Sequence, residues 1–563
     1  MSRKLTNIII LLIGILLFFA WWTSLNIGLS TDEYFHHING LKRYNFLISL
    51  GADKNFNFGN NELYPGLYDT LSYALGKLIL LINKKFYANN IDIVMHLINT
   101  SFSSLSILGL YIFTKKIFNK NIALLSSLLT LLNPFFFGHM GMNSKDIIIF
   151  FSLIWSCYYF YRYFINSQKI KDLILASFFI GFGCGVRLPF LILVFPIIVS
   201  GLVYLIYNNR SQYLNLFLKL SIHILISLLI ISFLILLCWP HILIQIQDGN
   251  FINFLFSNIL NTMNFHGPRT GLINGEYYEV FDTPKSYFLN IIIYRLPFYY
   301  TILVLISYLF ILTKKLTVKN EFKNFNIKFL ILNLIPFFPI LITIIMGIGV
   351  YDNLRLFLFV IPFFSIIGSL SLYQLINSSK ISWKFKTITS IIIILFSISF
   401  YRFISLTPYQ YDYVNYSSLK FKNAEYKWEH DYWGASYKEL ILSIKNNFSD
   451  EEIKKLKIAN CVGDDTLLYY LYRHLGIKKI YRNKLQHEAN HVILINRAIL
   501  NVFNNPDIEG LVDKDGVILV KDLEKIVRTP GVKTTCNEKF TGKDVVKVSR
   551  NGVTLSVLRK LNN

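Results

Sequence analysis

Charged residues are scarce in this sequence. Asp, Glu, Lys and Arg make up only 16% of the 563 residues, whereas 53% are hydrophobic and the mean hydropathy is +0.45. Soluble domains usually carry about 25% charged residues. The composition therefore argues against a wholly soluble protein.

The apolar residues fall in runs long enough to cross a bilayer, which takes about 20 residues per helix. These runs stop after Tyr401, where charged residues become frequent. We therefore predict a transmembrane domain over residues 1–404 and a soluble α/β domain over residues 405–563. The fold class is a polytopic α-helical membrane protein with about eleven transmembrane helices and additional juxtamembrane helices.

Acidic residues are outnumbered, with 33 Asp and Glu against 56 Lys and Arg, which gives a formal net charge of +23. In a soluble protein this excess would suggest nucleic acid, but no nucleic-acid-binding module is evident, and no such partner is predicted. Basic residues in short loops on the inner side of a membrane explain the excess instead, and they also favour anionic lipid head groups.

Loop charges predict the topology. Spans are expected at Thr6–Leu25, Val94–Thr114, Ile122–Phe137, Ile147–Tyr163, Leu173–Val186, Leu188–Tyr207, Leu220–Trp239, Phe288–Leu312, Phe329–Val350, Leu354–Leu375 and Ile388–Tyr401. The segment Tyr64–Ile82 is left at the outer interface, because counting it as a span would place the basic loops outside. This arrangement puts the N-terminus in the cytoplasm and the C-terminal domain outside, in a multi-pass protein of the cell inner membrane. The long outer loops are 28–95 and 240–287.

Cysteine is also rare, with five residues. Three lie in apolar segments and are expected to be small core residues. The other two, Cys461 and Cys536, lie in the soluble domain and could pair if that domain is extracytoplasmic. Two cysteines alone leave this question open.

An acidic pair, Asp32-Glu33, follows the first predicted span. Carboxylates near lipid are costly and need a reason. One interpretation is a general base that takes a proton from an acceptor hydroxyl. The other is a helix start, in which Ser30 or Thr31 is the cap and the acids favour the helix dipole. Both can hold at once.

A glycine-containing turn between the third and fourth spans carries polar side chains to the outer membrane face, where Asp32 is also expected. Lys145 could meet a phosphate, and Asp146 could fix Lys145 or cap the next helix. The same stretch holds His139 and Asn143. A lysine whose ammonium snorkels to the interface is the structural alternative.

Two arginines enter apolar helices from the outer side: Arg187 in Gly185-Val186-Arg187, and Arg355 after Tyr351-Asp352. Arginine makes bidentate contacts with phosphate that lysine cannot make, so this pair would suit a lipid phosphate. The alternative is a structural ion pair, such as Asp352 with Arg355. The second outer loop adds Glu276 beside aromatic and glycine residues, a mixture that suits a loop facing sugar.

One motif points to another chemistry. His487-Glu488-Ala489-Asn490-His491 matches H-E-x-x-H, which binds zinc when both histidines lie on one helical face. Here a strand-like run, Val492–Ile495, follows at once, and the longer form of the motif is missing. Further strands are predicted at Lys457–Cys461, Gly516–Val520 and Val553–Leu558.

The order of these pieces resembles the GT-C glycosyltransferases, most closely the type that holds protein O-mannosyltransferases and lipid A aminoarabinose transferases. The matching pieces are Asp32-Glu33, Lys115-Lys116-Ile117-Phe118, Gly138-His139 with Asn143-x-Lys145-Asp146, Gly185-Val186-Arg187, Tyr351-Asp352-x-x-Arg355, Leu358-Phe359-x-x-Pro362 and Asp431-Tyr432-Trp433-Gly434-x-Ser436. Each is short, but together they cover most of the chain.

The resemblance implies a membrane glycosyltransferase with a polyprenyl-phosphate sugar as donor and a lipid, glycan or protein hydroxyl as acceptor. Asp32 would be the general base and Glu33 a positioning or acceptor-binding group. Lys145, Arg187 and Arg355 would hold the donor phosphate, and the transfer would invert the anomeric carbon. The supporting residues would be His139, Asn143, Asp146, Glu276, Tyr351 and Asp352.

Departures from the family bear on the acceptor and on metal. His96 stands where the protein-mannosylating branch has an arginine, and no large domain lies between spans seven and eight, which puts protein as the acceptor in doubt. Some relatives use a divalent ion, but no dedicated ligand set is evident, so no metal or other cofactor is predicted.

Two other classes remain as alternatives. A polytopic transporter would usually show mid-membrane charges and related halves, whereas the charges here cluster at span ends and no internal repeat is evident. A membrane-anchored zinc hydrolase would use His487, Glu488 and His491.

Overall fold

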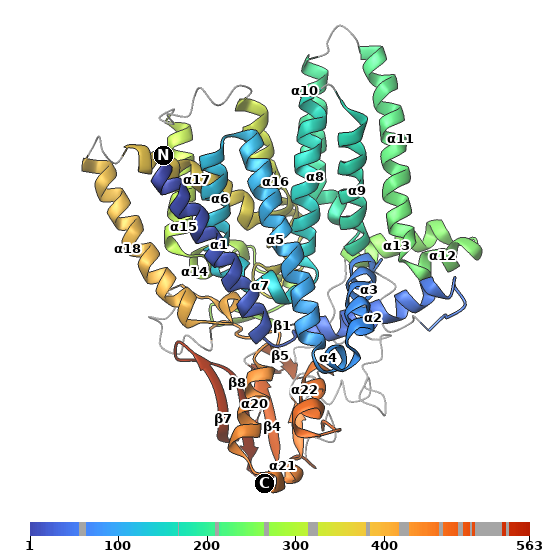
Figure 1. The fold of residues 1–563 in the computed structure, drawn as a ribbon, viewed down its shortest axis with the longest axis vertical. Coiled ribbons are helices and arrows are strands. Elements are labelled where there is room, and N and C mark those ends of the chain that lie inside the picture. The colour runs from blue at the N-terminus through green and yellow to red at the C-terminus, as the bar shows by residue number, and fades with distance from the viewer. Residues whose placement is uncertain are drawn as a thin grey trace.

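The computed structural model describes residues 1–55, 64–166, 168–208, 213–263, 270–313, 325–378, 383–415, 427–460, 465–481, 488–495, 498–501, 532–535 and 540–562. Long helices form a bundle, and a smaller domain of strands and helices lies at one end of it (Figure 1). The predicted combination of a helical membrane domain and a C-terminal α/β domain is confirmed.

Seven described helices are long and apolar enough to cross a membrane. They are α1 (Arg3–Asn26), α5 (Ile91–Ile117), α8 (Asp146–Ile165), α10 (Phe190–Asn208), α11 (Tyr213–Leu237), α17 (Val360–Ser378) and α18 (Trp383–Ser405). The apolar window of α8 is 78% buried inside the protein, whereas that of α11 is only 6% buried. Apolar side chains that no protein atom covers need lipid, so α11 lies at the lipid-facing edge of the bundle.

Two further spans are bent pairs of helices. Helices α6 (Lys120–Leu131) and α7 (Pro134–Met142) meet at 74°, and α14 (Tyr287–Arg295) and α15 (Phe298–Leu312) meet at 116°. Each break lies at a proline, Pro134 or Pro297, which cannot continue the hydrogen bonding of the preceding helix. Counting each pair as one span gives up to nine among the described residues.

The other two predicted spans fall on α9 (Ile170–Val186) and α16 (Phe325–Met346). Helix α9 has 17 residues, which corresponds to about 26 Å and is shorter than a typical hydrocarbon core. Every predicted span therefore overlaps a helix or a bent pair of helices, while the count of eleven crossings stays a prediction.

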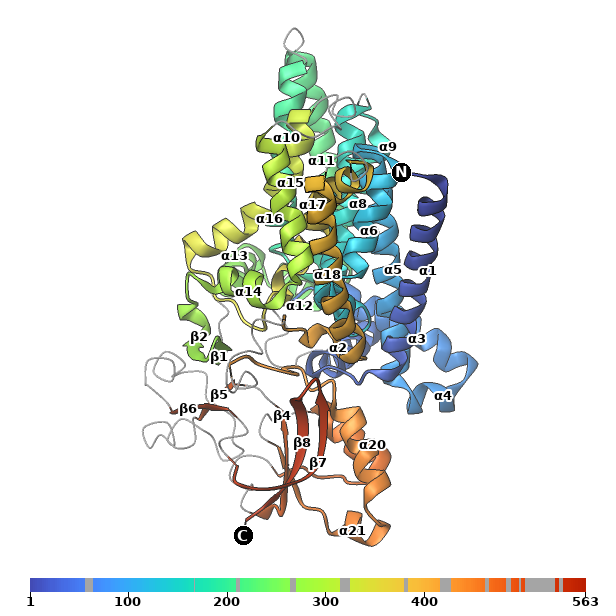
Figure 2. The same cartoon turned by 90° about the vertical axis from the view of Figure 1, so that its left-hand side faces the viewer.

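Short helices lie between the bundle and the C-terminal domain. They are α2 (Thr31–Ile48), α3 (Leu67–Ile82) and α4 (Lys84–Asn89), and both views place them at this end (Figures 1 and 2). The segment that was predicted to remain at the interface forms α3. The second long loop forms α12 (Pro240–Gln247), α13 (Phe251–Met263) and the hairpin of β1 (Thr270–Ile273) and β2 (Glu276–Glu279).

The C-terminal domain is built on a four-stranded sheet in the order β3-β4-β8-β7. Its strands are β3 (Ile458–Asn460), β4 (His491–Ile495), β8 (Val553–Leu561) and β7 (Gly542–Arg550), and only the β3–β4 pair is parallel. Helices α20 (Tyr437–Asn447), α21 (Asp450–Lys455) and α22 (Asp465–Leu475) accompany the sheet, and β5 (Ala498–Asn501) pairs with β6 (Val532–Thr535).

Three of the four predicted strands coincide with β3, β4 and β8. The fourth, Gly516–Val520, lies outside the described residues, as do Cys461 and Cys536.

The zinc-hydrolase alternative loses its structural basis. His491 begins strand β4 and is not on a helix, and His487 lies outside the described residues. In the described part of the chain, no group of three or more His, Cys, Asp or Glu side chains could hold a metal ion. His491 therefore lacks the place on a helix that this zinc chemistry requires.

Candidate active site

A buried arginine, Arg355, is the centre of a charged cluster at the end of the bundle that faces the C-terminal domain. Its NH1 lies 3.0 Å from Oδ2 of Asp32 and 3.3 Å from Oδ2 of Asp352, and its Nε lies 3.8 Å from Oδ2 of Asp146. The side chain of Arg355 is 3% exposed and that of Asp32 is 41% exposed. A buried charge needs such partners. Of these three carboxylates only Asp32 is open to an incoming molecule, because the other two are buried.

The loop before Arg355 brings it to this position. Asp352 and Asn353 have φ angles of +55° and +61°, a left-handed conformation that Asp and Asn tolerate better than most residues. A short 3₁₀ turn, η4 (Arg355–Phe357), follows at once. The sharp turn explains why Asp352 folds back onto Arg355, so the structural pair weighed from the sequence does form.

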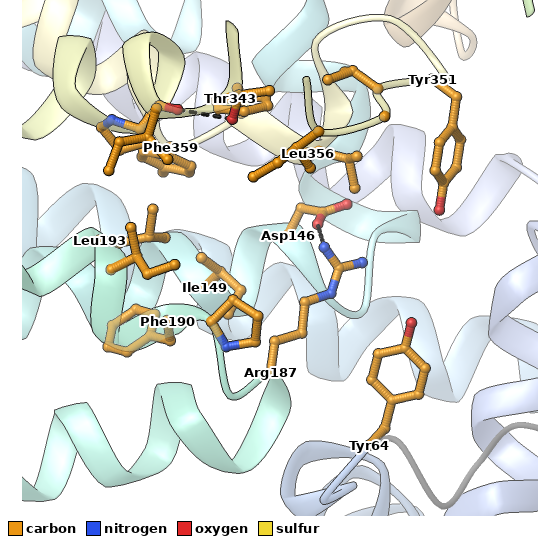
Figure 3. Close-up of a pocket in the computed structure, with 18 residues that line it drawn as sticks. Tyr64, Asp146, Ile149, Arg187, Phe190, Leu193, Thr343, Tyr351, Leu356 and Phe359 are labelled. Carbon is orange, nitrogen blue, oxygen red and sulfur yellow. Dashed lines mark hydrogen bonds and ion pairs between the residues drawn. The ribbon is translucent and has the colours of Figure 1, made fainter. Parts of the chain in front are cut away.

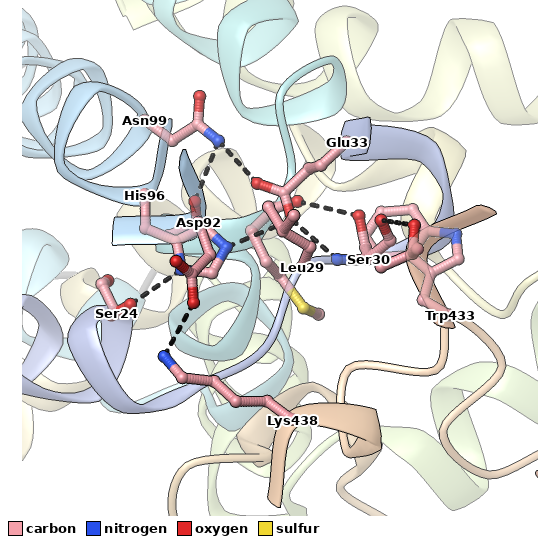
Figure 4. Close-up of polar contacts among 12 residues, drawn as sticks. Ser24, Leu29, Ser30, Glu33, Asp92, His96, Asn99, Trp433 and Lys438 are labelled. Atoms are coloured by element: carbon pink, nitrogen blue, oxygen red, sulfur yellow. Dashed lines mark hydrogen bonds and ion pairs between the residues drawn. The ribbon is translucent and has the colours of Figure 1, made fainter. Parts of the chain in front are cut away.

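The two neighbouring acids of α2 have different environments. Glu33 is fully buried, and its Oε2 accepts from the N–H of Ser30 at 2.8 Å, which closes a capping box at the start of α2. Its carboxylate also lies 3.2 Å from both His96 Nε2 and Asn99 Nδ2 (Figure 4). The helix-start interpretation therefore holds for Glu33, whose carboxylate is engaged by these contacts. Asp32 carries the exposed carboxylate.

Asn143 organises the turn between α7 and α8. Its Oδ1 accepts from the backbone N–H groups of Lys145 at 3.1 Å and Asp146 at 2.8 Å, and its Nδ2 donates to Oδ2 of Asp146 at 3.0 Å. His139 Nδ1 lies 3.3 Å from the same Nδ2. This pattern is an Asx turn, which fixes the start of α8 and the direction of the Asp146 carboxylate.

Asp146 joins the Arg355 cluster to a cavity. Its Oδ1 lies 3.1 Å from NH1 of Arg187, the residue that ends α9. The cavity has a volume of about 220 Å³ and lies against α8, α10, α16 and the loop before η4. Its polar lining includes Asp146, Arg187, Tyr64 and Tyr351, whereas most of the wall is apolar.

Figure 3 shows how this cavity divides. The apolar side chains of Phe190, Leu193 and Phe359 lie on one side, and the Asp146–Arg187 ion pair lies toward the other. The hydroxyl groups of Tyr64 and Tyr351 point toward each other beside this pair. An amphiphile with an apolar chain and an anionic head would match this division.

Lys145 lies beside the same polar end. Its Nζ is 4.2 Å from the centre of the Tyr64 ring, a cation–π contact. Burial, together with the positive charge of Arg187, lowers the pKa of Lys145 to about 8, although the carboxylates of Asp32 and Asp69 oppose the shift. The negative charge of these carboxylates therefore does not fully offset the cost of burying the Lys145 ammonium.

Behind Tyr64, a buried network connects α2 and α3. Arg43 donates to the carbonyl oxygens of Tyr64 and Pro65, each at 2.8 Å, and His36 Nδ1 lies 3.0 Å from Oδ2 of Asp69. These bonds fix the backbone that carries the Tyr64 ring over Lys145.

The structure brings most of the predicted residues together and leaves one apart. Glu276 is exposed at the start of β2, and none of the described contacts joins it to the charged cluster. Tyr64 and Trp433 were not among the predicted site residues, although the ring of Trp433 lies 4.6 Å from the guanidinium of Arg355. A single aromatic residue has no spacing pattern that predicts a site. The one signal for Trp433 was its place in the motif Asp431-Tyr432-Trp433-Gly434.

Comparisons with known proteins point to glycosyl transfer. Residues 78–239 match the family described as dolichyl-phosphate-mannose-protein mannosyltransferase. This range includes His139, Asn143, Lys145, Asp146 and Arg187. The match confirms the predicted resemblance to GT-C glycosyltransferases of the protein O-mannosyltransferase type. It also confirms the predicted enzyme class, a glycosyltransferase. No curated protein matches the sequence.

Solved structures also resemble the chain. ArnT from Cupriavidus metallidurans, bound to undecaprenyl phosphate, is 10% identical with a TM-score of 0.48, and the match covers 98% of this chain and 98% of that one. The oligosaccharyltransferase AglB from Archaeoglobus fulgidus, in complex with an inhibitory peptide and a dolichol-phosphate, is 11% identical with a TM-score of 0.44, over 87% of this chain and 70% of that one.

Proposed function

We propose that this protein transfers a sugar from a polyprenyl-phosphate carrier to a hydroxyl acceptor on the extracytoplasmic side of the membrane. The observation that carries the proposal is the cavity, whose apolar wall leads to Arg187 and Asp146. A polyprenyl chain matches the apolar wall, and its phosphate matches the cationic end. The cavity lies at the end of the bundle where the C-terminal domain is found.

Arg187 and Lys145 are the groups that bind the donor phosphate in this proposal. Arg187 lines the cavity, and Lys145 lies over the ring of Tyr64, which also lines it. Neither cation contacts as many carboxylates as Arg355 does. Arg187 can keep one contact with Asp146 and still present its remaining N–H groups to phosphate oxygens. When the sugar departs, these two cations stabilise the negative charge that develops on the leaving phosphate.

Asp32 is the proposed general base. The acceptor hydroxyl attacks the anomeric carbon, the bond from that carbon to the phosphate oxygen breaks, and Asp32 takes the hydroxyl proton. One displacement of this kind inverts the anomeric centre. Arg355 stabilises the ionised carboxylate of Asp32 and contacts Asp146, so the base and the phosphate site are connected through two buried side chains.

The extracytoplasmic side follows from the loop charges, because the positive-inside rule places the end with α2 and the C-terminal domain outside. The acceptor is a hydroxyl on a lipid, a glycan or a protein. Asp32 lies where the bundle and the C-terminal domain meet, since the N–H and hydroxyl of its neighbour Thr31 both donate to Trp433. That position suits an acceptor which arrives from outside the membrane.

A transfer assay with a matched control tests the proposal. Membranes that contain the protein are given radiolabelled mannosyl or aminoarabinosyl polyprenyl phosphate, and label in lipid, glycan and protein fractions is counted. Asp32→Asn should abolish transfer. Asp172→Asn is the control, because Asp172 pairs with Arg162 at 3.0 Å in a part of the chain outside the cluster. This variant should retain transfer. Equal transfer by wild type and Asp32→Asn, at equal expression, contradicts the base assignment. No transfer from either donor by the wild-type protein contradicts the choice of these donors.

A further inference from the structure

The C-terminal domain contains a rigid turn, Asp431–Ser436, directly below the charged cluster. Asp431 and Gly434 have φ angles of +46° and +66°, which Asp and Gly tolerate. The Asp431 carboxylate accepts from the backbone N–H groups of Ala435 at 2.8 Å and Ser436 at 3.2 Å, and from the hydroxyl groups of Tyr411 and Ser436. The carboxylate therefore holds the turn in one conformation.

This turn holds the start of α2. The carbonyl oxygen of Trp433 accepts from both the N–H and the hydroxyl of Thr31, each at 2.9 Å, and the carbonyl oxygen of Ala435 accepts from the N–H of Gly28 at 3.1 Å. Thr31 is the residue before Asp32. The backbone of the C-terminal domain thus satisfies N–H groups at the helix start that would otherwise have no partner.

Other contacts keep the domain at this position. The hydroxyl of Tyr470 accepts from the N–H of Leu29 at 2.7 Å, and Nζ of Lys438 lies 2.9 Å from Oδ2 of Asp92 (Figure 4). Asp92 is buried, and Arg473 also contacts it at 3.2 Å. Both cations come from the C-terminal domain, so docking neutralises a buried carboxylate of the membrane domain.

The indole of Trp433 connects the turn with Arg355. The guanidinium lies 4.6 Å from the centre of the indole, and the His139 ring meets the same indole edge-on at 5.3 Å. A guanidinium is planar, so carboxylates occupy its edge while an aromatic ring covers a face. The edge of Arg355 is occupied by Asp32, Asp146 and Asp352. The indole of Trp433 at 4.6 Å and the ring of Tyr351 at 5.3 Å lie against the guanidinium, and the closer indole does most to hold the plane in which these contacts are made.

We infer that Trp433 is a positioning residue for the transfer reaction and that the C-terminal domain is a part of the active site. The inference rests on the proposed function. Trp433 acts in two ways: its carbonyl oxygen holds the backbone next to Asp32, and its ring holds the arginine that pairs with Asp32. Removal of the ring should therefore slow the chemical step and leave donor binding at Arg187 and Lys145 intact.

A second arginine–tryptophan pair supplies the control. Arg295 lies 5.5 Å from the ring of Trp428, and both side chains are buried, but their described contacts do not include Asp32, Arg355 or α2. Trp428→Leu therefore removes a ring of the same type from the same part of the chain. Trp433→Phe is the conservative variant, because phenylalanine keeps an aromatic face for the guanidinium.

Transfer kinetics of the full-length protein in nanodiscs test the inference. Trp433→Leu should lower kcat by about 10- to 30-fold, the range for loss of a desolvated cation–π contact, with the donor KM within about twofold. Trp433→Phe should recover most of the kcat, and Trp428→Leu should keep it. A loss in Trp433→Leu no larger than in Trp428→Leu overturns the inference, because it would show only general destabilisation.

Hydrogen exchange gives a readout that needs no donor. Trp433→Leu keeps the carbonyl oxygen that accepts from Thr31, so its effect on α2 passes through Arg355 and Asp32. Loosening of the Arg355–Asp32 pair should make peptides that cover residues 28–36 exchange faster in Trp433→Leu than in Trp428→Leu and wild type. Equal exchange in the two variants would overturn the role of the ring in holding Arg355 against Asp32. Wild-type protein that transfers no sugar would contradict the proposed function, and exchange alone would then decide whether Trp433 holds this helix.

Discussion

The protonation of Lys145 should set the alkaline limit of the reaction. Burial and the nearby Arg187 lower the pKa of this lysine to about 8, and only the ammonium form attracts the donor phosphate. The donor is a phosphodiester, whose charge does not change in this range. Lys145 is protonated in about 90% of molecules at pH 7, about half at pH 8 and about 10% at pH 9, as expected for one group with this pKa. Binding therefore weakens as pH rises through 8.

The measurable quantity is kcat/KM for the donor, because it reports titration of the free enzyme. Between pH 6 and pH 10 it should be flat up to about pH 7.5 and then fall, approaching tenfold per pH unit above 8. Lys145→Arg should remove this fall, since a guanidinium stays protonated throughout. Lys77→Arg is the matched control, because Lys77 also lies over a tyrosine ring, that of Tyr44 at 4.6 Å. If kcat/KM for the donor still falls above pH 8 in Lys145→Arg, the assignment of this fall to Lys145 is refuted.

Three further predictions follow from single contacts. Arg355→Lys should lower kcat by roughly 10- to 100-fold in the transfer assay, because one ammonium cannot replace the charged hydrogen bonds of the guanidinium; a wild-type kcat would contradict this role. Gly138→Ala should lower the melting temperature, since a Cβ atom would lie 2.0 Å from the backbone nitrogen of Tyr411; an unchanged value would show that this approach can relax. Asp92→Asn should destabilise the protein by about 1.5–3 kcal/mol, because it removes the carboxylate that pairs with both Lys438 and Arg473; denaturant unfolding measures this, and a change below 1 kcal/mol would contradict it.

Hydropathy predicted the helices of the bundle well because membrane insertion depends on local composition. Each predicted span overlaps a helix or a bent pair of helices, and the segment with Asp69 and Lys77 forms α3 at the end of the bundle near the C-terminal domain (Figure 1). Strand β7 was missed because its first four residues are all exposed and only Val546–Val548 alternate between buried and exposed, which is too short a pattern to reveal a strand.

The site could be predicted only in part. The sequence placed Asp32 and Arg355 at the same membrane face, but their contact joins residues 323 positions apart and depends on the left-handed turn at Asp352. Local sequence cannot show that Arg355 would face three carboxylates. Nor could local sequence show which of the two acids is exposed. Glu33 is buried and closes the capping box, whereas Asp32 stays partly exposed, and this difference depends on the tertiary fold.

In the proposed site, donor binding and proton removal belong to different residues. Single-turnover transfer in nanodiscs, with donor affinity measured in the same samples, separates the two roles. Asp32→Asn should bind polyprenyl-phosphate sugar with wild-type affinity and transfer none of it, whereas Arg187→Ala should bind the donor at least tenfold more weakly. Wild-type transfer by Asp32→Asn, or wild-type affinity in Arg187→Ala, would contradict the account.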